Sequence, residues 1–233
     1  MGIQERKNRE KEERRALILD KAKELILEHG IDALSMQEIA DGAELSKATL
    51  YLYFQSKEAI LKEILAESAS AFVEYVESRI SPESSGIEAL RTLWASYMSL
   101  YGESHEVFVL TGISNFLEPG FLLDLGRTGA DLETPPGRML AMIAAVLERG
   151  ISDGTLKTDL KPLKLARTVI LIATAIIDTV ARLPRPARDS RIILAEMRSV
   201  FELLIRGLAA EGTDRALLAL PDLEAGRSRG RRP

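Results

Sequence analysis

Residues 35–57 read SMQEIADGAELSKATLYLYFQSK and alternate two short helical patterns with serines that can start a helix. Ser35 and Ser46 each precede one of these patterns. A serine side chain in that position accepts a hydrogen bond from an amide that the first helical turn leaves unpaired. Glu38, three residues after Ser35, completes the sequence pattern of a capping box. The stretch therefore predicts two short helices joined by a tight turn.

The two helices are expected over residues 36–41 and 47–54. On the first, the small side chain of Ala40 faces inward and lets the second helix approach closely. On the second, Leu50 and Phe54 are four residues apart and share the buried face. The outward face of the second helix carries Lys47, Ala48, Thr49, Tyr51, Leu52 and Tyr53.

This arrangement matches a helix that enters the major groove of DNA with its N-terminus first. The free amides and the dipole at that N-terminus favour phosphate. Ser46 and Lys47 are then placed to bind the DNA backbone. Thr49, Tyr51 and Leu52 are placed to meet base edges, Leu52 through a thymine methyl group. An ordinary helical hairpin with solvated polar faces would show the same spacing.

The stretch and its flanks resemble the DNA-binding domain of the TetR family of bacterial transcriptional regulators. The resemblance runs from residue 18 to about residue 65 and rests on AKELILEHG at 22–30, the Ile-Ala pair at 39–40, SKATLY at 46–51 and F-x-SKE at 54–58. It implies a regulator rather than an enzyme. The sequence itself shows no metal-ligand cluster, nucleophile elbow or phosphate loop that would support catalysis.

The resemblance also implies roles for single residues. The family's phosphate contacts fall on Ser35, Ser46, Lys47, Tyr53 and Lys57. Its base-reading or groove-lining positions fall on Ala48, Thr49, Tyr51 and Leu52. Glu44 departs from the pattern, because it stands where a turn glycine is usual, and a left-handed conformation costs a non-glycine residue about 1 kcal/mol. Ala48 and Leu52 also differ from relatives, so the resemblance does not give the operator sequence.

The composition indicates an all-α protein of 233 residues, with 5% aromatic residues and with Gly and Pro concentrated at breaks. There is no cysteine, which excludes a disulfide framework and a thiolate metal site and suits a reducing cytoplasm. Residues 1–15 have neither an apolar signal core nor a transit-peptide composition. We therefore expect a cytoplasmic protein without membrane association, metal or cofactor.

The net charge of −4 conceals a basic cluster near the N-terminus. The cluster consists of Arg6, Lys7, Arg9, Lys11, Arg14 and Arg15, interleaved with four glutamates. The local arrangement of charge, rather than its sum, decides whether a protein attracts DNA. Pairs such as Glu10 and Arg14 can also support a helix at four-residue spacing. A solvated helical extension and a basic arm that reaches DNA both fit this segment.

We expect a three-helix helix-turn-helix DNA-binding domain over residues 1–55, a larger helical ligand-binding and dimerisation domain over 56–210, and a largely disordered C-terminal segment over 211–233, where arginines stand among Gly and Ser. The periodicity of apolar residues predicts helices of the larger domain over 56–80, 87–101, 106–117, 138–150, 162–183 and 190–208. A Gly- and Pro-rich region between two of them leaves room for a short helix near 121–127.

Residues 169–181, VILIATAIIDTVA, are apolar on nearly every side of a helix. Arg167 and Asp178 interrupt the ~20 apolar residues that a membrane span needs. We expect this helix to pair with the last one and to form a four-helix bundle with the same two helices of a second subunit. The apolar residues of the last helix are Ile192, Ile193, Ala195, Met197, Val200, Leu203 and Leu204. The resemblance implies the same dimer interface, whereas a core helix of a monomer is the alternative.

Aromatic and methionine side chains gather in the middle of the larger domain. They are, together with neighbouring residues, Trp94, Tyr97, Met98, Tyr101, His105, Phe108, Phe116, Met139, Met142 and Ile143. Such side chains suit an adaptable cavity for a flat or apolar small molecule, and they equally suit an ordinary core. The resemblance implies that this domain holds an effector pocket.

Together these patterns predict a repressor that binds palindromic double-stranded operator DNA as a homodimer and is released by a small apolar or aromatic effector. Two recognition helices about one DNA turn apart, ~34 Å, would read two half-sites. The alternative is a DNA-bound regulator whose helical domain binds a protein partner or acts without a small-molecule inducer.

Overall fold

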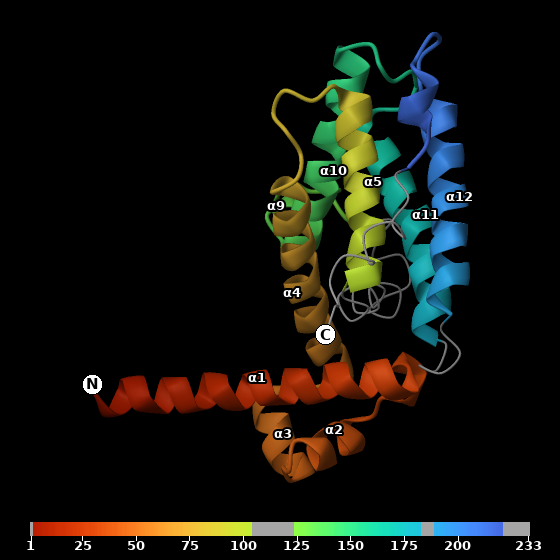
Figure 1. The fold of residues 1–233 in the computed structure, drawn as a ribbon. Coiled ribbons are helices and arrows are strands. Elements are labelled where there is room, and N and C mark those ends of the chain that lie inside the picture. The colour runs from red at the N-terminus through yellow and green to blue at the C-terminus, as the bar shows by residue number, and fades with distance from the viewer. Residues whose placement is uncertain (1, 104–123, 183–188, 221–233) are drawn as a thin grey trace, which may run out of the picture.

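An upright bundle of helices stands across a long first helix that lies at its base (Figure 1). The structure is a computed structural model that describes residues 2–103, 124–182 and 189–220. These residues are helical apart from turns, loops and one isolated bridge between Leu156 and Ala209. The expected all-α fold is confirmed.

The N-terminal unit consists of α1 (Ile3–His29), the 3-10 helix η1 (Ile31–Ala33), α2 (Met36–Gly42) and α3 (Lys47–Tyr53). Their inward side chains form a continuous core, because residues spaced three and four apart on each helix are apolar. Fully buried side chains of this core include Ile18, Ile26, Ile39, Leu50 and Ile60. The last of these belongs to α4, so the first turns of α4 complete the core of the N-terminal unit.

The larger domain is a bundle of long helices. It contains α4 (Lys57–Glu77), α5 (Gly86–Glu103), α10 (Pro135–Ser152), α11 (Pro162–Arg182) and α12 (Ser190–Leu208). Helix α10 lies at the centre and packs against α4, α5 and α11, and α12 packs mainly against α5. Their bounds agree with the predicted helices to within a few residues at each end. The predicted helix over 106–117 lies outside the described residues.

Helices α5 and α10 approach each other most closely where two glycines meet. A Cβ atom added to Gly86 would lie 2.0 Å from the Cα atom of Gly150, so Gly86 does not accept a side chain without a shift of the backbone, whereas a Cβ atom on Gly150 would lie 2.4 Å from the Leu156 side chain. A polar contact holds this crossing in place, since the Asp153 carboxylate accepts a hydrogen bond of 2.7 Å from the Gly86 amide. The crossing lies at the end of the bundle far from α1 (Figure 1).

The chain after α12 differs from the expected disordered segment. Residues 215–218 form the 3-10 helix η3 (Arg215–Leu218), and Leu220 is buried. Arg91 of α5 donates a hydrogen bond of 2.8 Å to the Ala219 carbonyl. Apolar residues that can pack on α5 and α12 therefore order positions 211–220 of the expected tail. Residues 221–233 lie outside the described part.

The Gly- and Pro-rich region before α10 is described from residue 124 onward. The short helix predicted near 121–127 falls largely outside the described residues. A four-residue helix, α9 (Gly129–Leu132), follows it, and the side chain of Thr128 caps its first turn together with Asp131. Of the helices that the structure describes, none is long and apolar enough to cross a lipid bilayer.

Candidate DNA interface and effector cavity

The N-terminus of α3 is open to solvent and capped as its sequence predicts. The Ser46 side chain accepts a hydrogen bond of 3.1 Å from the Thr49 amide, and the two hydroxyl oxygens lie 2.8 Å apart. Lys47 and Ala48, in the first turn, are exposed. Leu50 is fully buried and fixes the rotation of the helix. The first turn of α3 therefore presents its amides, a cation and hydroxyl groups outward.

The outer face of α3 also exposes two large side chains. Leu52 is 80% exposed and Tyr51 is 45% exposed, whereas Tyr53 is half-buried. Helix α3 thus offers an apolar group and a hydroxyl group to a partner. Of the predicted base-reading positions, Ala48, Tyr51 and Leu52 are exposed and Thr49 is half-buried.

The turn between α2 and α3 contains one residue, Glu44, with a left-handed backbone conformation. Glu44 has a φ of 55°, and the Leu45 amide donates a hydrogen bond of 2.8 Å to the Ala40 carbonyl. This six-residue closure is the usual end of a helix at a left-handed residue. Glu44 thus adopts the backbone conformation that glycine adopts at lower cost.

Ser35 and Lys57 hold the start of α2. The Ser35 hydroxyl accepts a hydrogen bond of 3.2 Å from the Glu38 amide and donates one of 2.8 Å to the Glu38 carboxylate. The reciprocal bond of a capping box, from the Ser35 amide, is therefore replaced by a bond from its hydroxyl. The Lys57 ammonium donates a hydrogen bond of 3.1 Å to the Leu34 carbonyl, so it braces the loop before α2 from the first turn of α4.

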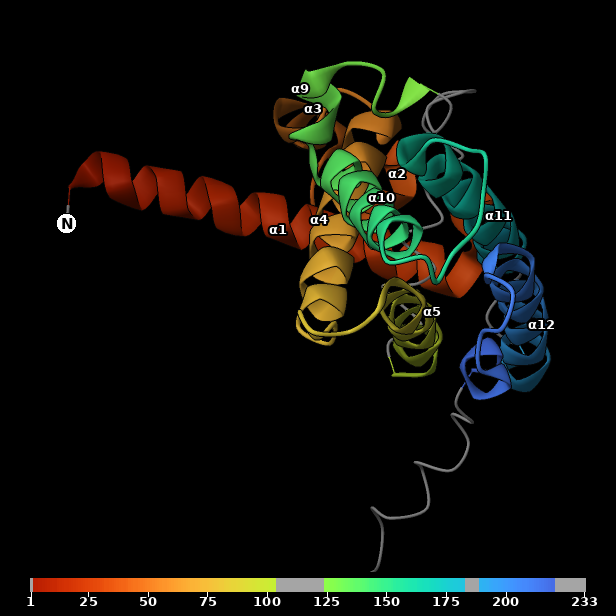
Figure 2. The same ribbon diagram turned by 90° about the horizontal axis from the view of Figure 1, so that it is seen from above.

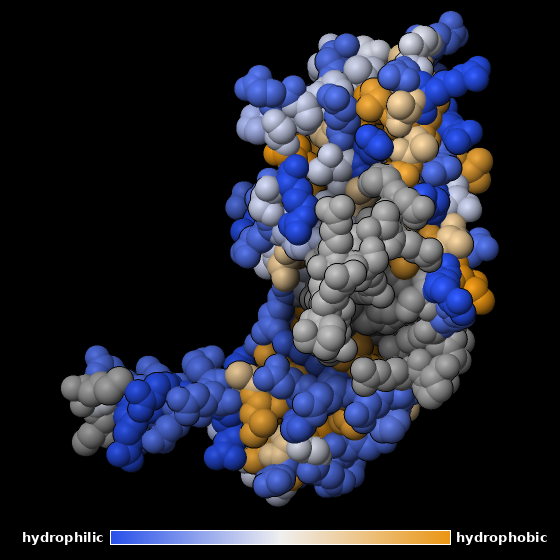
Figure 3. Space-filling view, viewed as in Figure 1, coloured by the Kyte–Doolittle hydropathy of each residue, from blue (hydrophilic) through white to orange (hydrophobic). Residues whose placement is uncertain are grey.

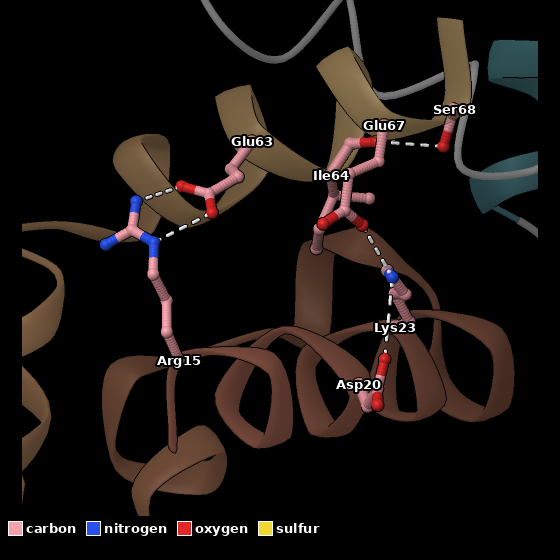
Figure 4. Close-up of polar contacts among 7 residues, drawn as sticks. All are labelled: Arg15, Asp20, Lys23, Glu63, Ile64, Glu67 and Ser68. Atoms are coloured by element: carbon pink, nitrogen blue, oxygen red, sulfur yellow. Dashed lines mark hydrogen bonds and ion pairs between the residues drawn. The ribbon is translucent and has the colours of Figure 1, made fainter. Parts of the chain in front are cut away.

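Arg15 joins three elements of the N-terminal unit. Its guanidinium forms a two-pronged ion pair with Glu63 of α4, in which Nε lies 2.8 Å from one carboxylate oxygen (Figure 4). The same group donates to the Tyr53 carbonyl at the end of α3 and lies 4.3 Å from the centre of the Phe54 ring. The end of α3 and the first half of α4 therefore contact the same side chain of α1.

A second ion pair connects α1 to α4. The Lys23 ammonium lies 2.7 Å from the Glu67 carboxylate and 3.5 Å from that of Asp20 (Figure 4). Burial lowers the pKa of Lys23, but the hydrogen bonds and charges of Glu67 and Asp20 together outweigh it and raise the pKa above its ordinary value. Lys23 is therefore charged at neutral pH. Two ion pairs, two turns apart on α1, fix the angle between α1 and α4.

A small apolar cavity lies between four helices of the larger domain. Its volume is about 40 Å³. The lining residues come from α4, α5, α10 and α11 and are Phe72, Leu93, Trp94, Tyr97, Met139, Ile143, Val169, Ile170, Ala173 and Thr174. A cavity of this size has room for about one water molecule, but an apolar lining offers a water few partners.

Aromatic rings form one side of the cavity. Trp94 stacks on Phe201 of α12 with ring centres 5.3 Å apart, and Tyr97 meets Phe72 edge to face at 5.8 Å. The Trp94 Nε1 atom is buried and has no hydrogen-bond partner among the described residues. Burial raises the pKa of Tyr97 well above its ordinary value, so its hydroxyl is neutral at physiological pH.

The structure places some of the predicted effector residues at this cavity and others elsewhere. Trp94, Tyr97, Met139 and Ile143 line it. Met98 is buried and Met142 is half-buried, but neither belongs to the lining. The side chain of Tyr101 and residues His105, Phe108 and Phe116 lie outside the described part.

Sequence reasoning missed the contributions of α4 and α11 to the cavity. Phe72 comes from α4, and Val169, Ile170, Ala173 and Thr174 come from α11. The last four recur with the spacing of a single helical face, which was the available signal. The prediction expected this segment to be buried on two sides, against the last helix and a second subunit, and did not place it at a cavity. The structure shows that one of its faces is used inside the protomer.

Helix α12 also has two distinct faces. Met197, Phe201 and Ile205 are buried in the core of the protomer. Ile192 is 64% exposed and Leu203 is 70% exposed on the other side. Among the described residues, no group of acidic or histidine side chains could hold a metal ion.

Comparison with known proteins adds to this geometry. Residues 18–64, which span α1, η1, α2, α3 and the first half of α4, match the family model described as bacterial regulatory proteins, tetR family. The chain is 27% identical over 195 residues to the fatty acid metabolism regulator protein of Bacillus subtilis (strain 168), which covers 82% of this chain and 93% of the relative.

Two further comparisons extend beyond the N-terminal unit. The HTH-type transcriptional repressor KstR2 of Mycolicibacterium smegmatis is 26% identical over 148 residues, 63% of this chain and 69% of that protein. A crystal structure described as a transcriptional regulator FadR from Bacillus subtilis in complex with stearoyl-CoA superposes with a TM-score of 0.54 at 27% identity, over 82% of this chain and 98% of the other. These proteins are regulators of transcription, not enzymes.

Proposed function

Because the chain belongs to the TetR family of transcriptional regulators, we propose that it is a repressor that binds palindromic operator DNA as a homodimer. The open, capped N-terminus of α3 carries this proposal. Ser35, Ser46, Lys47, Tyr53 and Lys57 bind phosphates, and Ala48, Thr49, Tyr51 and Leu52 line the groove and meet the bases. Lys57 does so with the donors that its bond to the Leu34 carbonyl leaves over, since an ammonium has three.

The outer faces of α11 and α12 form the dimer interface of this proposal. Ile192 and Leu203 are exposed on α12 and are eleven residues apart, which is three helical turns, so they lie on one stripe. Exposed apolar side chains in register on one helix favour burial against a second copy. The pair of recognition helices then reads both half-sites, which gives the specificity that one seven-residue helix lacks.

The effector of this proposal is a molecule with a long apolar chain, of the class of fatty acyl-CoA thioesters. The nearly pure hydrocarbon lining of the cavity supports this class, and so does the stearoyl-CoA bound to the FadR crystal structure that this chain resembles. The cavity of about 40 Å³ is far below the ~300–1,000 Å³ of typical ligand sites. The acyl chain must therefore separate the lining helices as it enters.

Separation of these helices gives a direct route to DNA release. Phe72 of α4 lines the cavity, and α4 carries Glu63 and Glu67, which are paired with Arg15 and Lys23 of α1. An acyl chain that pushes Phe72 outward therefore moves α1 and the helix-turn-helix unit. Effector and operator then favour different positions of α4, with a coupling of ~1–3 kcal/mol.

The first experiment measures binding of the purified protein to the DNA upstream of its own gene by footprinting and by anisotropy at several salt concentrations. Lys47→Ala should weaken binding to all sequences and reduce the log–log salt slope by about 1–2 per dimer. Thr49→Ala should instead change the preference among operator variants. An unchanged slope for Lys47→Ala would remove that residue from the interface.

The second experiment tests repression and the effector class. Transcription from the footprinted promoter in vitro should fall when the protein is added and recover with stearoyl-CoA but not with free coenzyme A. By linkage, the operator should weaken stearoyl-CoA binding by the same factor by which stearoyl-CoA weakens operator binding. Equal affinity for stearoyl-CoA with and without operator, or a rise in transcription on addition of the protein, contradicts the proposal.

A further inference from the structure

The first turns of α1 project beyond the rest of the molecule. In both ribbon views this part of α1 extends past α2 and α3 without another element beside it (Figures 1 and 2). Residues 4–14 are all exposed, and Arg15 contacts Glu63 of α4. At 1.5 Å per residue, residues 3–14 extend the DNA-binding unit by about 18 Å.

The projecting segment is strongly hydrophilic (Figure 3), but its cations differ in their partners. Arg6 pairs with Glu10 at 3.1 Å and Arg9 with Glu13 at 3.6 Å, four residues apart in each case. Lys7, Lys11 and Arg14 form no ion pair with any described residue. Arg6 and Arg9 are thus paired within the helix and Arg15 is paired with Glu63 of α4, whereas the other three cations of the cluster are available to an external anion.

The helical register places these three cations on the side of the helix-turn-helix. Lys7 and Arg14 are seven residues apart, as are Arg14 and Lys21, so all three share one face, and Lys11 is four residues from Lys7. The Lys21 side chain lies beside α2, where a Cβ atom on Gly42 would be 3.9 Å from it. The face that carries the available cations is therefore the face that is turned toward α2.

Acidic residues occupy the opposite side of the same helix. Glu5 and Glu12 are seven residues apart, and Glu12 is eleven residues, about three turns, from Lys23. Lys23 binds Glu67 of α4, so this face looks toward the larger domain. Glu5 and Glu12 of the extension therefore face the larger domain, whereas the available cations lie on the α2 side, next to Glu10, whose carboxylate pairs with Arg6.

We infer that Lys7, Lys11 and Arg14 form a further DNA-binding surface, which contacts phosphates of the duplex outside the half-site read by α3. The inference rests on the proposed function, because it takes α3 as the recognition helix. The reach of about 18 Å corresponds to about five base pairs at 3.4 Å each. The three cations complement the charge of DNA phosphates, and they lie on the face of α1 that is turned toward the helix-turn-helix. Both observations favour duplex DNA as the partner, because binding to an acidic protein or an anionic membrane would not require the cations to lie on that face.

The test uses the full-length protein and a 40-base-pair duplex of arbitrary sequence, because phosphate contacts do not depend on sequence. Anisotropy titrations at several salt concentrations give the slope of log affinity against log salt, which changes by about 0.9 for each phosphate contact. The variant Lys7→Ala/Lys11→Ala/Arg14→Ala should lose about 3–5 from the slope per dimer and bind at least about tenfold more weakly at 0.15 M salt. Alanine favours helix, so the extension persists, as circular dichroism will verify.

The matched control is Arg6→Ala/Arg9→Ala, which removes two cations from the same extension that are already paired with glutamates. This control should leave the slope within about 1 of the unmodified protein. Equal losses in the control and the triple variant would show a general charge effect and would overturn the inference, as would an unchanged slope in the triple variant.

The outcomes also separate this inference from the proposed function. If Lys47→Ala lowers the slope and the triple variant does not, α3 binds DNA and the extension does not. If the triple variant lowers the slope but Lys47→Ala does not, the recognition surface of the proposed function is wrong while the basic face still binds phosphate. A tighter binding of the triple variant to vesicles or to DNA than that of the unmodified chain contradicts an anion-binding role of the three cations.

Discussion

Glu44 shows how a single residue can carry backbone strain at the turn that positions α3. Its φ of 55° is the conformation in which a Cβ atom crowds the following carbonyl. The side chain is exposed and so gains little from packing. The strain is retained because the buried Ala43 and Leu50 on either side fix the course of the chain.

Glu44→Gly should therefore stabilise the protein by about 0.5–1 kcal/mol. The substitution relieves about 1–2 kcal/mol of backbone strain, which is more than the free energy lost because glycine gives the unfolded chain more conformational entropy. The midpoint of urea unfolding, at unchanged m-value, measures the effect. Glu44→Ala is the matched control, because it removes the charge and keeps the Cβ atom. Equal shifts for the two variants would mean that charge, and not backbone strain, is responsible.

At the scale of elements, α4 is the structural link between the two units. Its first turns complete the core of the helix-turn-helix unit, and its later residue Phe72 lines the cavity. The ion pairs of Arg15 and Lys23 hold it to α1. The side chains of Arg15 and Glu63 are both about 30% exposed, so solvent screens this pair only in part.

Loss of the Arg15 to Glu63 ion pair should loosen the link between α1 and α4. A double-mutant cycle with Arg15→Ala and Glu63→Ala, followed by urea unfolding, should give a coupling energy of about 1 kcal/mol. The same variants should reduce the factor by which stearoyl-CoA weakens operator binding. Arg6→Ala, which breaks an exposed pair on the same helix, should change neither quantity. A coupling energy near zero in the cycle refutes this role.

Filling the cavity should stabilise the closed bundle at the expense of effector binding. Ala173→Val adds two methyl groups at the lining, and cavity-filling substitutions commonly add about 0.5–2 kcal/mol. Ala175→Val is the matched control, because Ala175 is exposed on the same helix and valine has the same helix propensity there. Urea unfolding should place Ala173→Val above the control by about 0.5–1 kcal/mol, with weaker stearoyl-CoA binding. A lower stability than the control would mean that the cavity cannot hold the added groups.

The elements differ in how well the sequence predicted them. Helices α2 and α3 followed from local signals, since Ser35 and Ser46 act as caps within three residues of their partners. The cavity lining depends on which faces of distant helices meet, and no local signal places Phe72 against Val169. The same reason explains the ordered residues after α12, where Leu220 is buried by partners far away in the sequence.

At the scale of the whole molecule, one face of α12 stabilises the fold of the protomer and the other face is the proposed dimer interface. Phe201 and Ile205 complete the core of the protomer, while Ile192 and Leu203 remain exposed on the other face. The fold of one chain therefore leaves part of this helix uncovered. That division allows assembly to be perturbed without loss of the fold.

Leu203→Glu should yield a folded monomer, because it places a charge on the exposed stripe and leaves the buried face intact. Sedimentation equilibrium should show about half the mass of the unmodified protein, and operator binding should fall by at least about 100-fold as the two recognition helices become independent. The control is Leu160→Glu, a change of the same chemistry at an exposed leucine before α11. A dimeric Leu203→Glu variant would exclude this face as the interface.

The glycine contact between Gly86 and Gly150 has a mechanical consequence. Gly86 contacts the backbone of Gly150, so no change of side-chain conformation can let the two helices move closer at this point. Helices α5 and α10 therefore pivot about this contact, which lies at the end of the bundle far from α1 (Figure 1). A molecule that enters between α5 and α10 must move their opposite ends apart, and those ends lie toward the helix-turn-helix unit. A small widening at the middle of the bundle is therefore larger at the ends of α5 and α10 that lie nearest to α1.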